Sequence, residues 1–501
     1  MTRSETSYSP AGTPAGLAEL RTLLDTALDL VAKAAVDRPG PVRAGGPAGA
    51  RAAADAVLSG PLLPEEGCDP ADALTALAGP FADWSVDVTH PAALARMQCP
   101  PTAAAVAAEV VAATLNQSLH AWESGPFGLA LDRWVIAEFG ALVGYDPATC
   151  GGTLTAGGSV SNLMALIAAR DTTLGLRTVR FAAKEGLPAL GVQPVVVCPE
   201  GIHFSIQRGA RIIGIGEDAL RTVPTDADGR MRGDALERVL AGLPENEVPV
   251  AVIACAGSTD LGVVDPLDEI AEVTERHGVW LHADAAYGGG ALFSPRLRGL
   301  LKGIERADSV TLDLHKFGWV PASAAIMLVR AADTLASFGL DPTTCLSADD
   351  DTLAGYIGSQ NTSLQTTRRV DALKIAVTLR TLGARRLAEL VDTCHDLARH
   401  AAARLAEHPR VEVPVDPPMT ALLFRYLPAG PQDPDAFNGA LRRRVMEQGR
   451  ALIARTHLNG GRVYLKLIML NPDTTPAQVD AVIADLLALA EELDTRAAGE
   501  R

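Results

Sequence analysis

Two charged residues stand at positions where covalent chemistry on an amino group is expected. Asp284 follows the apolar run Val279–Ala283, and Lys316 follows the apolar run Ser309–Leu312. Both runs predict buried strands, where an unpaired charge is costly and requires a partner. A lysine amine can form a Schiff base with an aldehyde, and a carboxylate can keep a pyridine nitrogen protonated. Pyridoxal phosphate needs both groups, although a lysine taken alone is more often a solvated surface charge.

A glycine-rich run predicts an anion site upstream of these residues. Residues 154–159 read Leu-Thr-Ala-Gly-Gly-Ser and precede a helical pattern over 160–170. Gly158 lets the backbone approach an anion, Ser159 offers a hydroxyl and an amide, and the helix start adds partial positive charge. The alternative is an ordinary helix cap. The run contains neither the dinucleotide-binding pattern G-x-G-x-x-G nor a P-loop Gly-Lys-Ser/Thr.

Two further polar residues follow predicted strands. His203 comes shortly after the apolar run that ends at Cys198, and its imidazole could stack on a flat aromatic cofactor. A histidine that caps a helix is the alternative. Thr259 follows the apolar run that ends at Cys255 and could lie near a ring oxygen. The alternative for that run is a turn, in which Gly, Ser and Asp serve the backbone.

The elements that would position these residues alternate along the chain. Helical patterns cover 103–116, 129–143 and 160–175, and apolar β-rich runs cover 195–198, 248–255, 279–281, 309–312 and 324–329. This alternation predicts a mostly parallel sheet covered by helices. Ligands of such sheets bind where strands pass into loops, and the candidate residues lie at those points.

The flanking regions predict two smaller parts. Helical periodicity covers 16–36, 370–407, 434–449 and 476–494, and β-rich runs cover 411–413, 421–426 and 463–470. Residues 38–64 predict a loop with one short helix. We therefore predict an N-terminal helical segment over 1–95 that wraps around a partner chain, a large α/β domain over 96–370, and a small C-terminal α+β domain over 371–501.

The composition is that of a globular protein with two or three domains. Of the 501 residues 48% are apolar, which suits a large core. Asp and Glu number 60 against 44 Lys and Arg, and no basic cluster could follow a phosphate backbone. Nucleic acid is therefore not expected as a partner.

Export, membrane insertion and metal binding are not expected either. The longest uncharged stretch, residues 147–169, carries glycines, hydroxyl side chains and Asn162, so a loop followed by a helix fits it better than a membrane span. Residues 1–20 lack an apolar signal core, and we expect a cytoplasmic location. The seven cysteines show no CxxC pair and no Cys/His cluster of zinc spacing, which predicts reduced thiols.

Taken together, these motifs resemble the group II pyridoxal phosphate-dependent amino-acid decarboxylases. The resemblance extends from about residue 90 to 493 and lies in Asn116–Ser118, Thr155–Asn162, His203, Asp265–Leu267, His282–Gly288, His315, Lys316, Gln365–Arg369, Asp371–Lys374 and Met469–Pro472. Among the branches, the chain looks most similar to bacterial L-2,4-diaminobutyrate decarboxylases, on the runs Gln365–Arg369 and Asn116–Ser118. The resemblance implies an α/β fold of the aspartate aminotransferase type, called fold type I, and a homodimer.

The resemblance also implies a role for each candidate residue. Lys316 would carry the Schiff base, Asp284 would hold the ring nitrogen and His203 would stack on the ring. The remaining cofactor contacts would come from phosphate-binding and ring-lining residues, namely Gly158, Ser159, Asp313, His315, Thr259 and Ala286. Arg368 would meet the substrate carboxylate, and further substrate contacts would come from Gln98, His120 and Thr344.

Several positions depart from the family pattern, and two of them bear on the product and the substrate. Thr344 stands where a mobile loop usually carries a tyrosine thought to donate the last proton, and Tyr356 lies further along the same segment. His120 stands where the diaminobutyrate branch usually has an acidic residue. We expect decarboxylation of an L-amino acid to the amine and CO2. The alternatives are decarboxylation-dependent oxidative deamination to an aldehyde, or a catalytically silent relative that binds pyridoxal phosphate.

Overall fold

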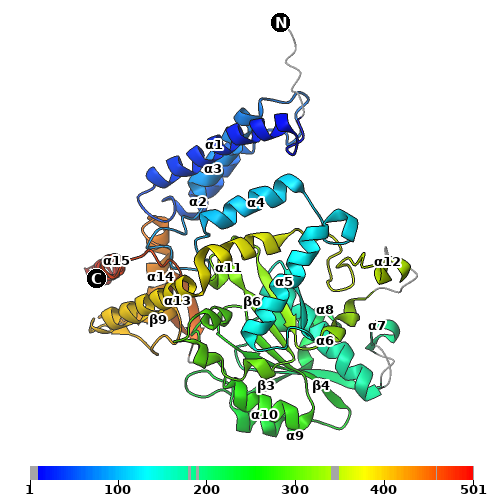
Figure 1. Ribbon diagram of the computed structural model, residues 1–501. Helices are drawn as coiled ribbons and strands as arrows, with labels where there is room; N and C mark the ends of the chain where they lie inside the picture. Colours follow the sequence, from blue (N-terminus) through cyan, green and yellow to red (C-terminus); the bar gives the residue numbers. More distant parts are fainter. Residues whose placement is uncertain (1–8, 179–181, 188–190, 340–348, 459, 500–501) are drawn as a thin grey trace. The chain divides into compact units, whose positions relative to one another are not determined.

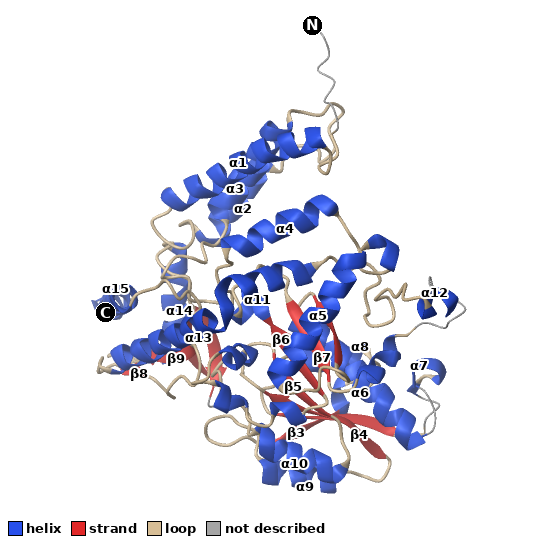
Figure 2. Ribbon diagram, viewed as in Figure 1, coloured by secondary structure: helices blue, strands red, loops and turns tan. Residues whose placement is uncertain are grey.

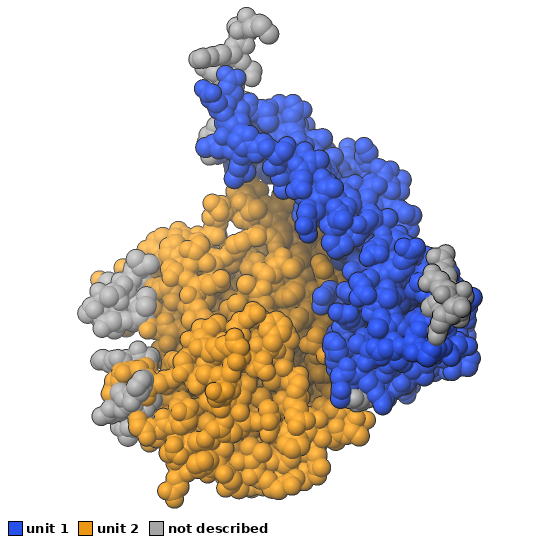
Figure 3. Space-filling view, turned by 180° about the vertical axis from the view of Figure 1, so that it is seen from behind, with its two compact units in different colours: residues 1–96, 397–416, 422–501 blue, residues 97–396, 417–421 orange. Residues whose placement is uncertain are grey.

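A computed structural model of the chain describes residues 9–178, 182–187, 191–339, 349–458 and 460–499. The chain divides into two compact units, coloured separately in Figure 3. The larger unit comprises Met97–Asp396 and Pro417–Ala421, and the smaller one comprises Met1–Arg96, Leu397–Asp416 and Leu422–Arg501. The N-terminal segment thus shares a compact unit with most of the C-terminal region. The prediction of three domains stays a prediction.

The larger unit is built on a seven-stranded sheet (Figure 1). Its strands are β1 (Gly151–Thr155), β2 (Gln193–Pro199), β3 (Leu220–Val223), β4 (Glu247–Cys255), β5 (Leu281–Ala285), β6 (Ser309–Asp313) and β7 (Ala325–Val329). The strand order is β1-β7-β6-β5-β4-β2-β3. Strand β7 runs antiparallel to β1 and β6, and the other neighbours are parallel. The predicted mostly parallel sheet is confirmed.

Helices and 3₁₀ segments surround this sheet. The helices of the larger unit are α4 (Ala103–Leu115), α5 (Pro126–Val143), α6 (Gly158–Thr178), α7 (Ala182–Glu185), α8 (Ser205–Ile212), α9 (Gly233–Ala241), α10 (Leu267–His277), α11 (Leu314–Phe317) and α12 (Asp349–Leu353). The 3₁₀ segments are η1 (Trp122–Ser124), η3 (Glu217–Ala219), η4 (Gly288–Phe293), η5 (Arg298–Leu301), η6 (Ile304–Arg306) and η7 (Ala332–Phe338).

Both faces of the sheet are covered (Figure 2). Successive residues of a strand face opposite sides. On β1, a Cβ at Gly152 would lie 3.2 Å from Ile136 of α5, whereas a Cβ at Gly151 would lie 3.1 Å from Leu335 of η7. Helix α6 lies on the same face as η7, because Met164 shares one buried core with Leu335 and the sheet.

The smaller unit combines helices with a four-stranded sheet. Its helices are α1 (Pro14–Val36), α2 (Gly46–Val57), α3 (Pro70–Trp84), α14 (Pro434–Glu447) and α15 (Pro476–Gly499), and its strands are β8 (Val411–Glu412), β9 (Ala421–Tyr426), β10 (Ala454–Leu458) and β11 (Arg462–Ile468). The strand order is β10-β11-β9-β8. Phe424, Leu465 and Leu486 belong to the core between this sheet and its helices. Helix α13 (Asp371–Ala406), kinked at Gly383, continues along the chain from the larger unit into this one.

Several elements lie where the sequence predicted none, among them the helices α7 to α12 between residues 182 and 353. The loop expected before α6 contains β1, whose residues Gly151–Thr155 are too few and too glycine-rich to show an alternating pattern. The short strands β3 and β10 and the helix α3 were missed as well. Strand β5 begins at Leu281, two positions after the predicted start. Among the described residues, no helix has the length and apolar character of a membrane span.

Candidate active site

The ends of β5 and β6 bring two predicted residues onto neighbouring strands. Asp284 pairs in register with Thr311, and the Asp313 amide donates to the Ala286 carbonyl at 3.1 Å. Both carboxylates are buried. Lys316 follows on the short helix α11, which begins directly after β6. The polar side chains therefore gather at one edge of the sheet, as the predicted strand ends require.

Asp313 holds the lysine. Lys316 Nζ lies 2.8 Å from Asp313 Oδ2, and His315 Nε2 lies 3.7 Å from the same oxygen. The other oxygen, Asp313 Oδ1, is buried and accepts no hydrogen bond from the described residues. A buried carboxylate oxygen without a donor costs free energy, which marks this point as one where a polar ligand group is expected.

The start of α6 reaches the same strand ends. A Cβ on Gly158 would lie 2.9 Å from the Ala286 Cβ and 3.0 Å from Asp313 Oδ2, so only glycine fits without a shift of its neighbours. The first turn of a helix leaves its amides without partners inside the helix, and these amides bind anions. Ser159 is exposed at this turn, and a Cβ on Gly157 would lie 3.8 Å from His315 Cε1.

Asp284 is surrounded by hydrogen-bond donors. Asn162 Nδ2, from α6, donates to Asp284 Oδ2 at 2.7 Å, and the Ala286 amide donates to Asp284 Oδ1 at 3.2 Å. Hydrogen bonds to a carboxylate favour its charged form. The two donors therefore compensate for the burial of this carboxylate.

His203 lies within electrostatic range of both charged residues. Its pKa is lowered mainly by burial, while Asp284 raises it and Lys316 lowers it. The ring is half-buried just before α8, and its Nδ1 accepts the Ser205 amide at 3.3 Å. His203 thus also contacts the start of helix α8. This contact agrees with the alternative interpretation of His203 as a residue that caps a helix.

Two further predicted residues are exposed on the larger unit, and a third lies outside the described residues. Thr259 is exposed in the turn after β4, where the Gly262 amide donates to the Ser258 carbonyl at 2.9 Å. Gln98 is exposed just before α4. Thr344 lies outside the described residues.

His120 lies between two serine hydroxyls. Its Nδ1 is 2.8 Å from Ser118 Oγ, and its Nε2 is 3.5 Å from Ser124 Oγ. The next aromatic residue, Trp122, contacts Tyr356 edge-on with ring centroids 4.8 Å apart. The half-buried imidazole is therefore held by neutral groups of its own segment.

Arg368 already has a carboxylate partner. Its Nη2 lies 3.0 Å from Asp132 Oδ2, and both side chains are only 5–6% exposed. The guanidinium also donates to Ser359 Oγ at 3.1 Å and to the Leu154 carbonyl at 3.4 Å. A buried guanidinium requires such a partner. The expected contact with a substrate carboxylate stays a prediction.

Nothing in the sequence marked Asp132, Asn162 or Ser205 as functional residues. Asn162 is the last residue of a family motif and one of the polar residues that disfavour a membrane span, and no pattern in the sequence marked its contact with Asp284. The three side chains contact residues that are distant in the sequence, and these contacts make them part of the site.

These groups fit pyridoxal phosphate. The cofactor combines an aldehyde, a protonated ring nitrogen and a phosphate. The described residues provide an amine at Lys316, a hydrogen-bonded carboxylate at Asp284, and a helix start at Gly158. The orphaned oxygen of Asp313 and the close approach at Gly158 both lie among them.

Comparison with known proteins gives concordant matches. The family model described as "Pyridoxal-dependent decarboxylase conserved domain" matches residues 82–427. The chain is 39% identical to an L-2,4-diaminobutyrate decarboxylase of Rhizobium meliloti, over 86% of this chain and 84% of that protein. It is 33% identical to an L-2,4-diaminobutyrate decarboxylase of Acinetobacter baumannii, over 82% of each.

A solved structure has the same fold. The glutamate decarboxylase domain of diaminobutyrate-pyruvate transaminase and L-2,4-diaminobutyrate decarboxylase from Vibrio parahaemolyticus superposes with a TM-score of 0.84 at 27% identity. The match covers 96% of this chain and 97% of that one. The predicted α/β fold of type I is confirmed.

Proposed function

The chain belongs to the family of pyridoxal-dependent decarboxylases, and from that premise we propose which residues act and which amino acid is consumed. It is a pyridoxal phosphate-dependent enzyme that decarboxylates an L-amino acid to an amine and CO2. When bound, the cofactor supplies a ring that accepts the electron pair left behind as CO2 departs.

Each residue at the strand ends has a separate role in this proposal. Lys316 would hold the cofactor covalently through its amine. Asp284 would keep the ring nitrogen protonated, because a carboxylate favours a nearby positive charge. His203 would cover the ring. The phosphate end would be held by Gly158, Ser159, Asp313 and His315, and the ring would be lined by Thr259 and Ala286. The ion pair between Lys316 and Asp313 supports this division, because it keeps the amine at the strand ends.

Peptide mapping tests the assignment of Lys316. Reduction of the loaded enzyme with borohydride followed by digestion is expected to leave the cofactor label on the peptide that carries Lys316. A label on another lysine would overturn the assignment. Lys302, which pairs with Asp268 on the exposed surface, is the control position.

We propose L-2,4-diaminobutyrate as the substrate. The observation that carries this proposal is the pair of matches to decarboxylases of that amino acid, at 39% and 33% identity over more than four-fifths of the chain. His120, whose side-chain partners among the described residues are the hydroxyls of Ser118 and Ser124, is the position that would separate this substrate from others. A second ammonium group on the substrate gains from a carboxylate nearby and not from an imidazole.

A substrate panel tests the proposal. Purified enzyme is offered diaminobutyrate, ornithine, dopa and the standard amino acids, and both amine and aldehyde are measured under air and under nitrogen. We expect the highest kcat/KM and an amine product with diaminobutyrate. In His120→Asp, kcat/KM for diaminobutyrate is expected to rise about tenfold, equal to about 1.4 kcal/mol. An aldehyde product, or a neutral amino acid as best substrate, would contradict the proposal.

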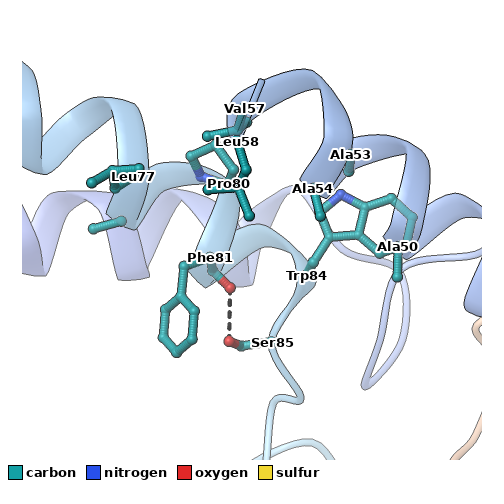
Figure 4. A pocket seen from close by; sticks show the side chains of 11 residues that line it. Ala50, Ala53, Ala54, Val57, Leu58, Leu77, Pro80, Phe81, Trp84 and Ser85 are labelled. Atoms are coloured by element: carbon teal, nitrogen blue, oxygen red, sulfur yellow. Dashed lines mark hydrogen bonds between the residues drawn. The ribbon is translucent and has the colours of Figure 1, made fainter. Parts of the chain in front are cut away.

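We also propose that the enzyme is a homodimer. The helices of the N-terminal segment expose large apolar side chains, including Leu28 at 64%, Leu77 at 54% and Phe81 at 75%. An apolar hollow of about 590 Å³ lies between α2 and α3, lined by Val57, Leu77 and Trp84 among others (Figure 4). Such exposure is unusual for a chain that remains alone in water, and a second copy is the partner that the family resemblance implies.

A further inference from the structure

A series of side-chain hydrogen bonds connects Trp280 to His203, and one of its members, Asn162, also contacts Asp284. We call it the Asn162 network. Its members are Trp280, Ser309, His282, Asn162, Ser205 and His203, with Asp284 as a branch. They come from the residue before β5, from β5, β6 and α6, from the segment before α8 and from the start of α8 itself.

The hydrogen-bond directions follow from Asp284. A carboxylate oxygen accepts, so the Asn162 atom 2.7 Å from Asp284 Oδ2 is the amide nitrogen, and the amide oxygen of Asn162 faces His282 Nε2. That oxygen can only accept, so His282 Nε2 carries a proton. In the neutral ring His282 Nδ1 then has a lone pair, and Ser309 Oγ, which accepts from Trp280 Nε1 at 2.9 Å, donates to it at 2.8 Å.

His282 is neutral at physiological pH. The ring is 1% exposed, and burial lowers the pKa of His282 to about 4, against the charge of Asp284, which raises it. Nε2 therefore donates to Asn162 Oδ1 at 3.1 Å. The contact of Asn162 with the Asp284 carboxylate settles which end of the amide is nitrogen.

Both protons of the Asn162 amide nitrogen are then used in hydrogen bonds. One goes to Asp284 Oδ2 at 2.7 Å and the other to Ser205 Oγ at 2.9 Å. The Ser205 amide donates to His203 Nδ1 at 3.3 Å, so this nitrogen is an acceptor. The Ser205 hydroxyl lies 2.8 Å from the same Nδ1 and therefore donates to it as well. Two donors thus face the Nδ1 atom of His203.

We propose that Asn162 and Ser205, oriented by His282 and Ser309, are positioning residues that keep His203 as the neutral tautomer with its proton on Nε2 and keep Asp284 hydrogen-bonded as a carboxylate. The proposal deepens the proposed function, on which the roles of His203 and Asp284 rest. His203 then offers an N–H from Nε2 and no lone pair. Protonation at Nδ1 requires the Ser205 hydroxyl to turn away and leaves the Ser205 amide facing a second N–H.

The charged groups around His203 shift its pKa in opposite directions. Asp284 of β5 and Asp313 of β6 favour protonation of the ring, whereas Lys316 of α11 and Arg208 of α8 oppose it. Because these charges oppose one another, the hydrogen bonds at Nδ1 decide which of the two ring nitrogens of His203 carries the proton.

Nitrogen NMR of the full chain labelled with ¹⁵N-histidine tests the proposal without turnover. His203 is assigned by comparison with His203→Gln, and spectra are recorded for the cofactor-free and the loaded protein across pH. We expect an unprotonated Nδ1 and a protonated Nε2 in the neutral ring. In Ser205→Ala the loss of one donor to Nδ1 is expected to raise the pKa of His203 by about one unit. Ser205→Thr, which keeps a hydroxyl, is expected to restore the original titration.

A matched control separates the network from general effects of a buried substitution. Thr173 lies on α6 like Asn162, is buried, and donates to the Val250 carbonyl at 3.2 Å. Thr173→Val is expected to leave the titration of His203 unchanged. In the loaded enzyme, the acid limb of kcat/KM should move to higher pH in Ser205→Ala by the same amount as the NMR titration.

A proton on Nδ1 of His203 in the wild type, or an unchanged titration in folded Ser205→Ala, would overturn the proposal. The wild-type spectrum decides the tautomer even if that variant does not fold. Because the tautomer is measured in the cofactor-free protein, the network is supported or overturned whatever substrate the enzyme turns over. A wrong substrate would refute only the proposed function.

Discussion

At the scale of single residues, Asp284 is the position where charge matters most. Asp284→Asn keeps the size of the side chain, and its amide oxygen can still accept from Asn162, so the fold should be retained. A neutral amide cannot hold a ring nitrogen protonated. We expect turnover to fall roughly 10²–10³-fold, the range for loss of one preorganised electrostatic group. Steady-state kinetics on protein with an unchanged circular dichroism spectrum measures this, and near-normal turnover would refute the role of Asp284.

Asp132 is a second residue whose charge has a clear consequence. Asp132→Asn leaves the guanidinium of Arg368 buried without a charged partner. The free energy of unfolding is expected to fall by about 3–5 kcal/mol, the range for a broken buried ion pair. Denaturant unfolding measures the change. The exposed pair of Arg386 and Glu389 is the control, since Glu389→Gln should change stability by less than about 1 kcal/mol. Equal losses in the two variants would contradict the buried ion pair.

At the scale of elements, the start of α6 must approach β5 and β6 closely. Gly158→Ala would place a methyl group 2.9 Å from the Ala286 Cβ, so that the helix start has to shift. Such overpacking costs about 1–3 kcal/mol. We expect the affinity for pyridoxal phosphate to fall about 5- to 150-fold, measured by fluorescence titration of the cofactor-free protein.

Gly299 provides the control for this element. A Cβ there would have no neighbour within 4 Å, so Gly299→Ala should bind the cofactor like the wild type. Wild-type affinity in Gly158→Ala would mean that the phosphate end binds elsewhere.

Strand β5 also carries a buried neutral histidine, which makes stability depend on pH. The pKa of His282 is about 4 in the folded state, below the ordinary value of 6.5. Between these two values the unfolded chain binds a proton that the folded protein does not, so stability is full above pH 6.5 and is lost as the pH falls toward 4. The loss amounts to about 3 kcal/mol.

Urea unfolding at pH 7 and pH 4 of wild type and His282→Gln measures this contribution. The difference between the two proteins in their pH dependence is expected to be about 3 kcal/mol. An identical pH dependence would show that His282 does not titrate in this window.

At the scale of the whole molecule, the exposed apolar side chains of the N-terminal helices predict association. Phe81→Glu and Leu77→Glu place a charge on α3 beside the apolar hollow. We expect each variant to weaken the dimer at least about tenfold in sedimentation experiments, since burial of an unpaired charge at an interface is costly. Leu176→Glu, at an exposed leucine on α6, is the control and should leave association unchanged. A wild-type monomer would refute the dimer.

The parts of the fold that repeat a local pattern were predictable. Apolar runs of ordinary strand length predicted β2, β4, β6 and β7, and helical periodicity predicted α4, α5, α6 and α13. Strands β1, β3 and β10 were not predictable, because they are short and are completed by pairing with distant segments. Strand β1 pairs with β7, which lies far along the chain.

The active site, like the fold, has parts that the sequence predicts and parts that it does not. The sequence by itself determined the charged residues at strand ends, Asp284 and Lys316, and the glycine-rich start of α6, because each follows an element whose pattern is local. Only the tertiary structure decided that Asp132 pairs with Arg368 and that Asn162 donates to Asp284. The physical reason is that a buried polar group takes whichever partner folding brings within hydrogen-bond reach, and that partner need not be near in the sequence.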